Sequence, residues 1–464
     1  MRAEKVQKKK KAGIIAIVLL LTVFFWGCME EPQKSVPEEG QRPEKEAVLT
    51  AETGDKQMKD TQQREEAEAK QEQMPEDKTQ QASEAETLRP KVKGIFVTGP
   101  MAGTDNMENL IDLVERTELN TIVMDVKNDE GRIVYNMELP EVEEVGAGIR
   151  YVRDMEGLIA ECKEKDIYLI ARIVAFKDPF LAKVKPEWCI QCSDGSVFHD
   201  KNGLAWLNPY NREVWDYLLA VAKEALRIGF DEVQFDYIRF STDGGMESVD
   251  FGKEAEDKDR QQIITEFVRY ASEEIHEAGG VISADVYGMV IDSEVDQRIV
   301  GQNYKEMSKY LDYISPMIYP SHYGPYNYNI PVPDAEPYRL VLTALQSSKK
   351  VLAGIPLTTV SGNEMPEYAQ EELAALLPAE EVRAQVRPWL QDFTATWVKG
   401  HISYEAEEIR AQIQAVYDAG YEEWILWNAS NRYTEGGLLS DNGSDEEQHL
   451  NVKSEIPMAE TGSE

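Results

Sequence analysis

Gly229–Phe240 reads GFDEVQFDYIRF, and this stretch decides the fold because its residue types alternate with a period of two. Val233 and Phe235 fall on an apolar face, whereas Gln234 and Asp236 fall on a polar one. Alternation at this period predicts a β-strand. In an open antiparallel sheet the polar face would simply meet water, but in a parallel barrel it would point into the interior.

Apolar runs of strand length alternate with helix-like segments on both sides of this strand. The eight expected strands are 93–99, 120–127, 167–176, 231–240, 281–287, 313–319, 386–393 and 423–430. The clearest helices between them are 106–116, 153–165, 211–228, 260–278 and 404–419. This order predicts an α/β fold, the (β/α)₈ TIM barrel. Residues 351–355 fit poorly: they are either an extra strand or the true seventh strand.

The N-terminus has the pattern of an export signal. Basic residues among positions 2–11 precede an apolar run at 12–26 and then Gly27 and Cys28. The run is short for a membrane span, which needs ~20 apolar residues. We expect residues 1–28 to be a signal peptide or lipoprotein anchor with lipid on Cys28. The alternative is an uncleaved transmembrane anchor, and either one places the domain outside the cytoplasm, tethered to the cell membrane.

Charge separates the rest of the chain into parts. Residues 28–89 hold 17 acidic and 9 basic residues and no aromatic residue, so we expect 29–90 to be a disordered acidic linker. The folded domain should span 91–433, and 434–464 should form an acidic flexible tail. Residues 90–464 hold 34 basic against 67 acidic residues, a balance that argues against nucleic acid as a partner.

The cysteines and short motifs indicate no metal or organic cofactor. Cys189 and Cys192 form a lone C-x-x-C, and no second pair completes a zinc site. A local disulfide is possible outside the cytosol, but we interpret these cysteines as structural. The sequence contains no HExxH, no Gly-x-Ser-x-Gly elbow and no glycine-rich phosphate loop after the first strand.

Two carboxylates are the candidate catalytic residues. Asp236 and Asp285 occur at equivalent depths in adjacent expected strands. Neighbouring strands lie ~4.8 Å apart, close to the ~5–5.5 Å between the carboxyl groups of retaining glycosidases. One carboxylate would stay ionised and act at the anomeric carbon. The other would keep its proton and donate it to the leaving oxygen.

Further polar and aromatic residues occur late in the strands or just beyond them, where a substrate would bind. Lys127 or Arg172 could instead form an internal ion pair, and the aromatic residues could instead fill the core. The candidate substrate-binding residues are Asp125, Lys127, Arg172, Arg239, Tyr287, Tyr319, His322, Gln391, Trp427 and Asn428.

GFDEVQFDYIRF, together with ISADVYG, SPMIYP, RPWLQDF and WILWNAS, resembles a bacterial family of exported proteins assigned as glycoside hydrolases. The family was formerly a domain of unknown function, and its TIM barrel is similar to the α-amylase superfamily. The resemblance runs from about Val92 to Tyr433 and implies that Asp236 takes the place of the nucleophile. The superfamily's strand-five acid is a glutamate, whereas this chain has Asp285. Its strand-seven His-Asp pair has no counterpart in LQDF, so amylase-like specificity is not implied.

The sequence therefore predicts a membrane-tethered, extracytoplasmic glycoside hydrolase that acts on a surface or extracellular polysaccharide. One alternative is a non-catalytic carbohydrate-binding lipoprotein with the same barrel. Another is an esterase or deacetylase, although no nucleophilic serine or histidine-rich metal set supports it. The second carboxylate separates the first two hypotheses, because an enzyme needs it and a binding protein does not.

Overall fold

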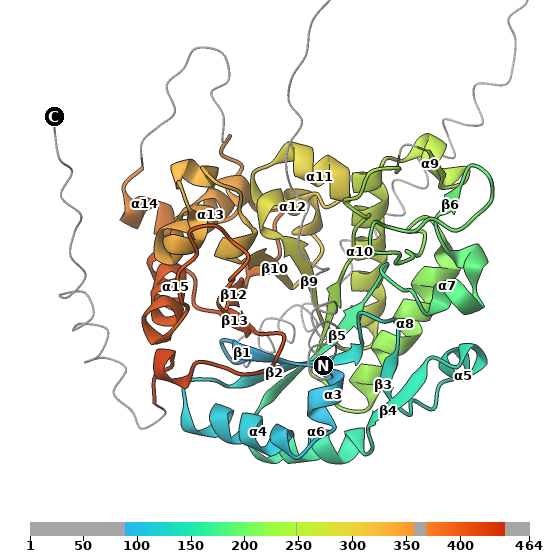
Figure 1. Cartoon of the computed structure of the whole chain (residues 1–464), viewed down its shortest axis with the longest axis horizontal. Helices are drawn as coiled ribbons and strands as arrows, with labels where there is room; N and C mark the ends of the chain where they lie inside the picture. Colours follow the sequence, from blue (N-terminus) through green and yellow to red (C-terminus); the bar gives the residue numbers. More distant parts are fainter. Residues whose placement is uncertain (1–88, 247, 357–367, 441–464) are drawn as a thin grey trace, which may run out of the picture. The chain divides into compact units, whose positions relative to one another are not determined.

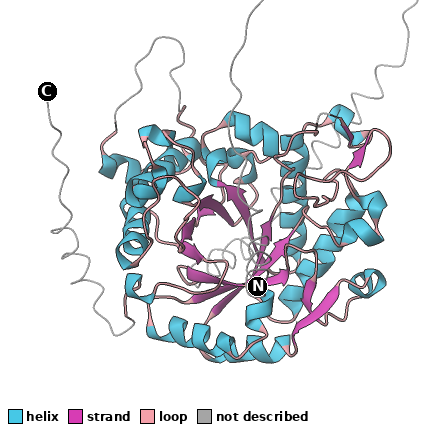
Figure 2. Ribbon diagram, in the orientation of Figure 1, coloured by secondary structure: helices cyan, strands magenta, loops and turns pink. Residues whose placement is uncertain are grey.

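The computed structural model describes residues 89–246, 248–356 and 368–440. In this part of the chain, eight parallel strands form a closed ring that helices surround (Figure 1, Figure 2). β1 pairs with both β2 and β13, which closes the barrel. The ring consists of β1 (Lys93–Val97), β2 (Thr121–Lys127), β5 (Tyr168–Val174), β7 (Glu232–Asp236), β9 (Val281–Tyr287), β10 (Tyr313–Ile318), β12 (Trp389–Gln391) and β13 (Trp424–Trp427). The predicted (β/α)₈ barrel is confirmed.

Helices connect most successive strands and cover the outside of the ring (Figure 1). The long ones are α4 (Asn106–Arg116), α6 (Met155–Glu164), α8 (Arg212–Arg227), α10 (Arg260–Glu277), α13 (Pro337–Leu352) and α15 (Ala406–Asp418). Each buries an apolar stripe, as an amphipathic helix packed on a sheet does. The shorter ones are α3 (Gly99–Ala102), α9 (Glu254–Asp257), α11 (Glu294–Val300), α12 (Tyr304–Met307) and α14 (Gln370–Ala374).

The two faces of β7 point as its alternation predicts. Phe235 faces outward, and its ring lies 5.5 Å from that of Phe267 on α10. Gln234 and Asp236 face the barrel interior, where the Gln234 amide donates to the Ser315 hydroxyl across the barrel (3.3 Å). The polar face of GFDEVQFDYIRF is therefore an interior face, not a solvent face.

One predicted ambiguity is resolved at residues 351–355. Val351 and Leu352 end α13, and the seventh barrel strand is β12, within the expected 386–393. The apolar run there is the last turn of an amphipathic helix that Gly354 terminates in a left-handed conformation (φ 74°). A short β11 (Gln385–Val386) adds to β10 ahead of β12.

Two insertions enlarge the barrel. The first was not anticipated: β3 (Ile133–Tyr135), α5 (Pro140–Val145) and β4 (Gly148–Val152) extend the sheet beside β2. The second is the long loop at 177–208, which holds α7 (Leu181–Val184) and β6 (Gln191–Cys192). β6 pairs with β8 (Val249–Asp250), and Cys189 and Cys192 are free thiols, not a disulfide.

The described residues stop short of both predicted termini. The signal or anchor at 1–28, nearly all of the linker 29–90 and the tail beyond 440 lie outside them. Residues 434–440, which we assigned to the tail, pack on the barrel: Glu118 donates its backbone N–H to the Leu439 carbonyl (2.8 Å). Within the described ranges, no helix has both the length and the apolar character needed to cross a membrane.

Candidate active site

The C-terminal ends of four neighbouring strands bring charged side chains together at one end of the barrel, here called the mouth. Asp125 on β2 and Arg172 on β5 are register partners. Phe235 on β7 pairs with Ala284 on β9, so the next residues of the two strands, Asp236 and Asp285, lie level. All four charged side chains are at least nine-tenths buried. Ionisable groups this deep in a barrel are unusual, because branched aliphatic residues normally fill it.

Arg172 organises the carboxylates of the mouth. It donates to Asp236 Oδ2 from Nε (3.0 Å) and Nη2 (2.5 Å), and from Nη1 to Asp125 Oδ1 (2.6 Å). Its Nη2 also lies 3.5 Å from Asp129 Oδ1. Burial alone would lower the pKa of Arg172, but the charge of Asp236 and the other carboxylates raises it well above the usual value. One guanidinium thus fixes three carboxylates that would otherwise repel each other.

Asp236 is held from two sides. Its Oδ2 accepts the two Arg172 bonds, and its Oδ1 accepts the backbone N–H of Tyr237 (2.6 Å). Tyr237 adopts a left-handed backbone conformation (φ 52°), which is uncommon for a residue with a side chain. Strained backbone of this kind clusters at functional sites. The strand therefore ends abruptly with its last carboxylate in one defined orientation.

Asp285 lies in a different environment. Its side chain is 1% exposed, and the Trp389 indole N–H donates to Oδ1 (2.6 Å). Burial, and then repulsion from Asp236, raise the pKa of Asp285 well above its usual range. Among the described residues, no cation lies within ion-pairing distance of it. Asp285 therefore holds its proton to a higher pH than an ordinary aspartate does, while its neighbour faces an arginine.

Three of the predicted substrate-binding residues are used internally instead. Lys127 is fully buried and pairs with Asp178 (2.7 Å). The Gln391 amide donates to Asp334 Oδ1 (3.1 Å), and the Asn428 amide donates to the Arg432 carbonyl (2.8 Å). Because these side chains hold strands and loops in place, we leave them out of the candidate site.

An aromatic patch lies beside the charged cluster. Tyr319 packs on Trp427 (centroids 5.6 Å apart) and on the exposed His322 (5.3 Å), and all three were predicted. Phe393 joins them at 5.3 Å from Trp427, and Trp397 stacks on Phe393 at 5.9 Å with an interplanar angle of 17°. Trp397 is 57% exposed. Phe393 and Trp397 were not among the predicted site residues, although the segment DFTATW (392–397) places both aromatic residues at or just after the end of the seventh strand.

The remaining predicted residues lie at the mouth as well. Arg239 follows β7, and its guanidinium lies 4.5 Å from the centre of the Tyr287 ring, at the end of β9. Asp125 has a pKa raised to about 6, chiefly by burial, with Arg172 opposing the shift. Within the described residues, no group of three or more His, Cys, Asp and Glu side chains is arranged to hold a metal ion.

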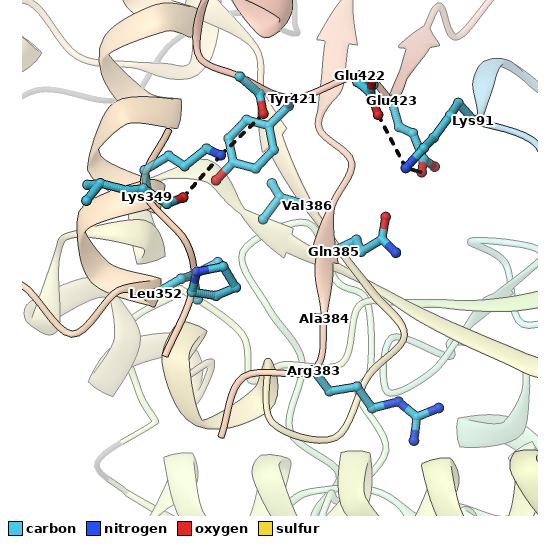
Figure 3. Close-up of a pocket in the computed structure, with 13 residues that line it drawn as sticks. Lys91, Lys349, Leu352, Arg383, Ala384, Gln385, Val386, Tyr421, Glu422 and Glu423 are labelled. Carbon is cyan, nitrogen blue, oxygen red and sulfur yellow. Dashed lines mark hydrogen bonds and ion pairs between the residues drawn. The ribbon is translucent and has the colours of Figure 1, made fainter. Parts of the chain in front are cut away.

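A pocket of about 220 Å³ lies at the opposite, N-terminal end of the strands (Figure 3). Its lining includes Lys91, which pairs with Glu422 (3.3 Å). It also includes Lys349, which donates to the Gly420 carbonyl (3.2 Å) and lies 4.4 Å from the centre of the Tyr421 ring. These contacts join the end of α13 to the start of β13. Residues at this end of a TIM barrel usually serve stability.

Comparisons with known proteins identify the family and the fold of this chain. The model of a family described as "Putative glycosyl hydrolase domain" matches residues 94–433. A hypothetical protein from Ruminiclostridium thermocellum is 39% identical, over 41% of this chain and 97% of its own, with a TM-score of 0.39. The PgaB (BpsB) glycoside hydrolase domain from Bordetella bronchiseptica is 11% identical, over 73% and 94%, with a TM-score of 0.51, a likeness of fold alone. No curated protein matches.

Proposed function

The chain belongs to the "Putative glycosyl hydrolase domain" family, and from that premise we propose that it hydrolyses a polysaccharide with Asp236 and Asp285 as its two carboxyl groups. One observation carries the proposal: two level carboxyl groups on adjacent strands have opposite environments. Asp236 faces Arg172, whereas Asp285 is buried without a cation and has a raised pKa. Pairs of this kind divide nucleophile and acid roles between them.

The level placement favours the retaining mechanism, because the two carboxyl groups come from strands ~4.8 Å apart. Asp285 gives its proton to the glycosidic oxygen as the C–O bond breaks, and an Asp236 oxygen bonds to the anomeric carbon. The ester that forms on Asp236 carries no charge. Burial still raises the pKa of the Asp285 carboxyl, but the repulsion from Asp236 that also raised it is gone. The Asp285 carboxylate then takes a proton from the water that hydrolyses the ester.

Aromatic side chains supply a surface for sugar rings beside this pair. Trp397 and Trp427 lie in the aromatic patch with Tyr319, next to the strand that carries Trp389, the partner of Asp285. Flat rings of this type pack on the apolar faces of sugars. A patch that extends beyond a single ring supports a polymer as substrate.

A carbohydrate-binding protein without activity is the second candidate, and one observation favours it. Both oxygens of Asp236 already accept hydrogen bonds within the protein, as in a purely structural ion pair. A binding protein, however, does not need a second carboxyl group beside Asp236, whereas a glycoside hydrolase does.

An assay of new reducing ends decides between the two candidates. Wild-type protein is incubated with a panel of neutral and acidic polysaccharides, and the double variant Asp236→Asn/Asp285→Asn serves as the blank for contaminating hydrolases. We expect at least one polymer to be cleaved by the wild type and not by the blank. Binding to a polymer with no cleavage of any would favour the binding protein.

We also propose that Cys28 carries lipid and holds the domain at the outer face of the cell membrane. The support is the basic segment, the apolar run and Gly27-Cys28 in the sequence. Cys28→Ser should release the protein or leave its signal uncleaved, as fractionation and N-terminal mass analysis would show. Unchanged retention and unchanged processing would contradict lipid attachment.

A further inference from the structure

Arg239 is a buried cation without a negative partner. Its side chain lies three residues beyond Asp236 and is only 6% exposed. Among the residues that the structure describes, no carboxylate lies within 4.0 Å of its guanidinium, and its single hydrogen bond runs from Nη1 to the Phe240 carbonyl (2.8 Å). The other N–H groups of the guanidinium remain free to bind a ligand.

The other buried cations in the described part of the barrel are all paired. Lys127 bonds to Asp178, Arg172 to Asp236, and Arg387 to Glu232 (2.7 Å). Burial of a charge without a partner costs several kcal/mol, so proteins rarely keep one. Arg239 is therefore an exception among the buried cations of the described residues, and it lies at the mouth of the barrel.

Three aromatic rings surround this guanidinium. Its central carbon lies 4.8 Å from the ring centre of Trp206, 4.9 Å from that of Tyr237 and 4.5 Å from that of Tyr287. Cation–π contacts hold a cation in place without neutralising its charge. A planar guanidinium held in this way is preorganised to bind a planar anion with two parallel hydrogen bonds.

We propose that Arg239 binds a carboxylate of the substrate, and that the polysaccharide is therefore acidic, with a uronic acid residue at or next to the cleaved bond. Tyr237 adjoins Asp236 in the chain, and Tyr287 lies two residues beyond Asp285 on the same face of β9. The two tyrosines that contact Arg239 thus come from the same strand ends as the two carboxyl groups. This inference names the substrate class of the proposed hydrolase and rests on that function.

The strong negative charge of the domain does not oppose this assignment. Residues 90–464 carry 34 basic and 67 acidic residues, which repel an acidic polymer at long range. At physiological salt such repulsion is screened beyond about 8 Å, whereas a contact inside the protein is screened much less. The Lys177 ammonium also lies 4.5 Å from the centre of the Tyr237 ring, but it is paired with Asp129 (3.7 Å).

The test compares matched ligands by calorimetry. Oligogalacturonate and a glucuronate-containing hyaluronan oligosaccharide are titrated into the wild-type domain, each beside its carboxyl-reduced, neutral counterpart. We expect at least one acidic ligand to bind about 10- to 100-fold more tightly than its neutral form. Arg239→Gln should remove this preference and leave the neutral form's affinity within about threefold.

Control variants separate recognition from structural support. Arg239→Lys keeps the charge without the planar fork and should retain only part of the preference. Arg212→Gln removes another stacked arginine, 3.6 Å from the centre of the Trp215 ring but paired with Glu266, and should change nothing. Equal wild-type affinity for acidic and neutral forms, or no binding to either, overturns the proposal. An equal loss of affinity for the acidic and neutral forms in Arg239→Gln also overturns it. So does tighter binding of a sulfated oligosaccharide than of the carboxylated ones.

The outcome is independent of hydrolysis. An Arg239-dependent preference without cleavage of any polymer would leave the carboxylate-binding role of Arg239 standing and remove the proposed activity. Cleavage of a neutral polymer, with no preference for the acidic form, would do the reverse.

Discussion

At the N-terminal end of the barrel, Arg387 donates to Glu232 (2.7 Å), stacks on Tyr313 (3.9 Å) and lies 3.9 Å from Glu423. At the mouth, Arg172 faces three aspartates. Both arginines are buried inside one barrel among carboxylates. The difference is that Asp285 stands next to the second cluster without a cation of its own. Each glutamate of the first network has a cation within 4.0 Å and helps to hold strands together, whereas a buried carboxyl group without a cation is suited to proton transfer.

The largest expected effect comes from the mouth. Asp236→Asn should lower kcat by roughly 10³- to 10⁵-fold, because an amide cannot form the covalent intermediate. Cooperative unfolding should persist, since Arg172 keeps Asp125 and Asp129 as partners. Initial rates on whichever polymer is cleaved, with denaturant melts alongside, measure both quantities. Turnover of Asp236→Asn close to that of the wild type would show that the charged cluster at the mouth is structural, like the one around Arg387.

The corresponding change at the other end should affect stability instead. Arg387→Met leaves Glu232 buried without its cation and should cost about 3–5 kcal/mol in the free energy of unfolding. The rate per folded molecule should stay within a few-fold of the wild type. Arg172→Met is the matched variant at the mouth and should abolish activity. If Arg387→Met lowers kcat while the free energy of unfolding is unchanged, the N-terminal end does not serve stability alone and the comparison fails.

Asp285→Asn tests the acid at the mouth. Without a proton donor, hydrolysis of the natural polymer should slow by roughly 10²- to 10³-fold, and aryl glycosides with good leaving groups should largely escape the loss. Because the folded-state pKa of Asp285 is raised, the wild-type rate should fall as pH rises through that pKa, at a higher pH than for an ordinary aspartate. The variant should lack this alkaline decline. A pH profile identical to the wild type would assign the proton to another group.

The smallest effect is expected on the aromatic patch. Trp397→Ala should raise KM for a long polymer by a few-fold, consistent with about 1 kcal/mol of lost stacking, and leave kcat unchanged. Leu377→Ala removes an exposed apolar side chain (81% exposed) beside the pocket at the N-terminal end and should change neither constant. Equal effects of both substitutions would show that Trp397 has no special part in binding.

Local patterns predicted the barrel and the pair of carboxyl groups. The alternation in GFDEVQFDYIRF predicted which side of β7 is internal, and the matching alternation in ISADVYG placed Asp285 beside Asp236. Partners from distant loops could not be predicted in this way. Lys127 and Arg172 are both cationic residues late in a strand, so the sequence does not distinguish their roles. Lys127 forms an internal ion pair because Asp178 approaches it from the loop after β5.

The inserted β3–β4 pair was missed for a related reason. Its strands are short, and β3 joins the edge of β2 through a single pair of register partners, Lys127 and Ile133. The end of α13 was ambiguous because a short apolar run suits a strand or a helix equally well. In both cases the surrounding fold, not the local sequence, determined the outcome.

The left-handed conformation of Tyr237 has an evolutionary consequence. In a regular strand, residues three apart point to opposite faces, so Asp236 and Arg239 would be separated by the sheet. The turn at Tyr237 brings both to the mouth, at a conformational cost of about 1–3 kcal/mol. We expect that gain or loss of one residue in this segment would turn Arg239 away from Asp236 and Asp285 without disrupting the strand that precedes it. Among descendants of this protein, preference for a charged or a neutral polymer should therefore change by insertion and deletion here more readily than by substitution within the strands.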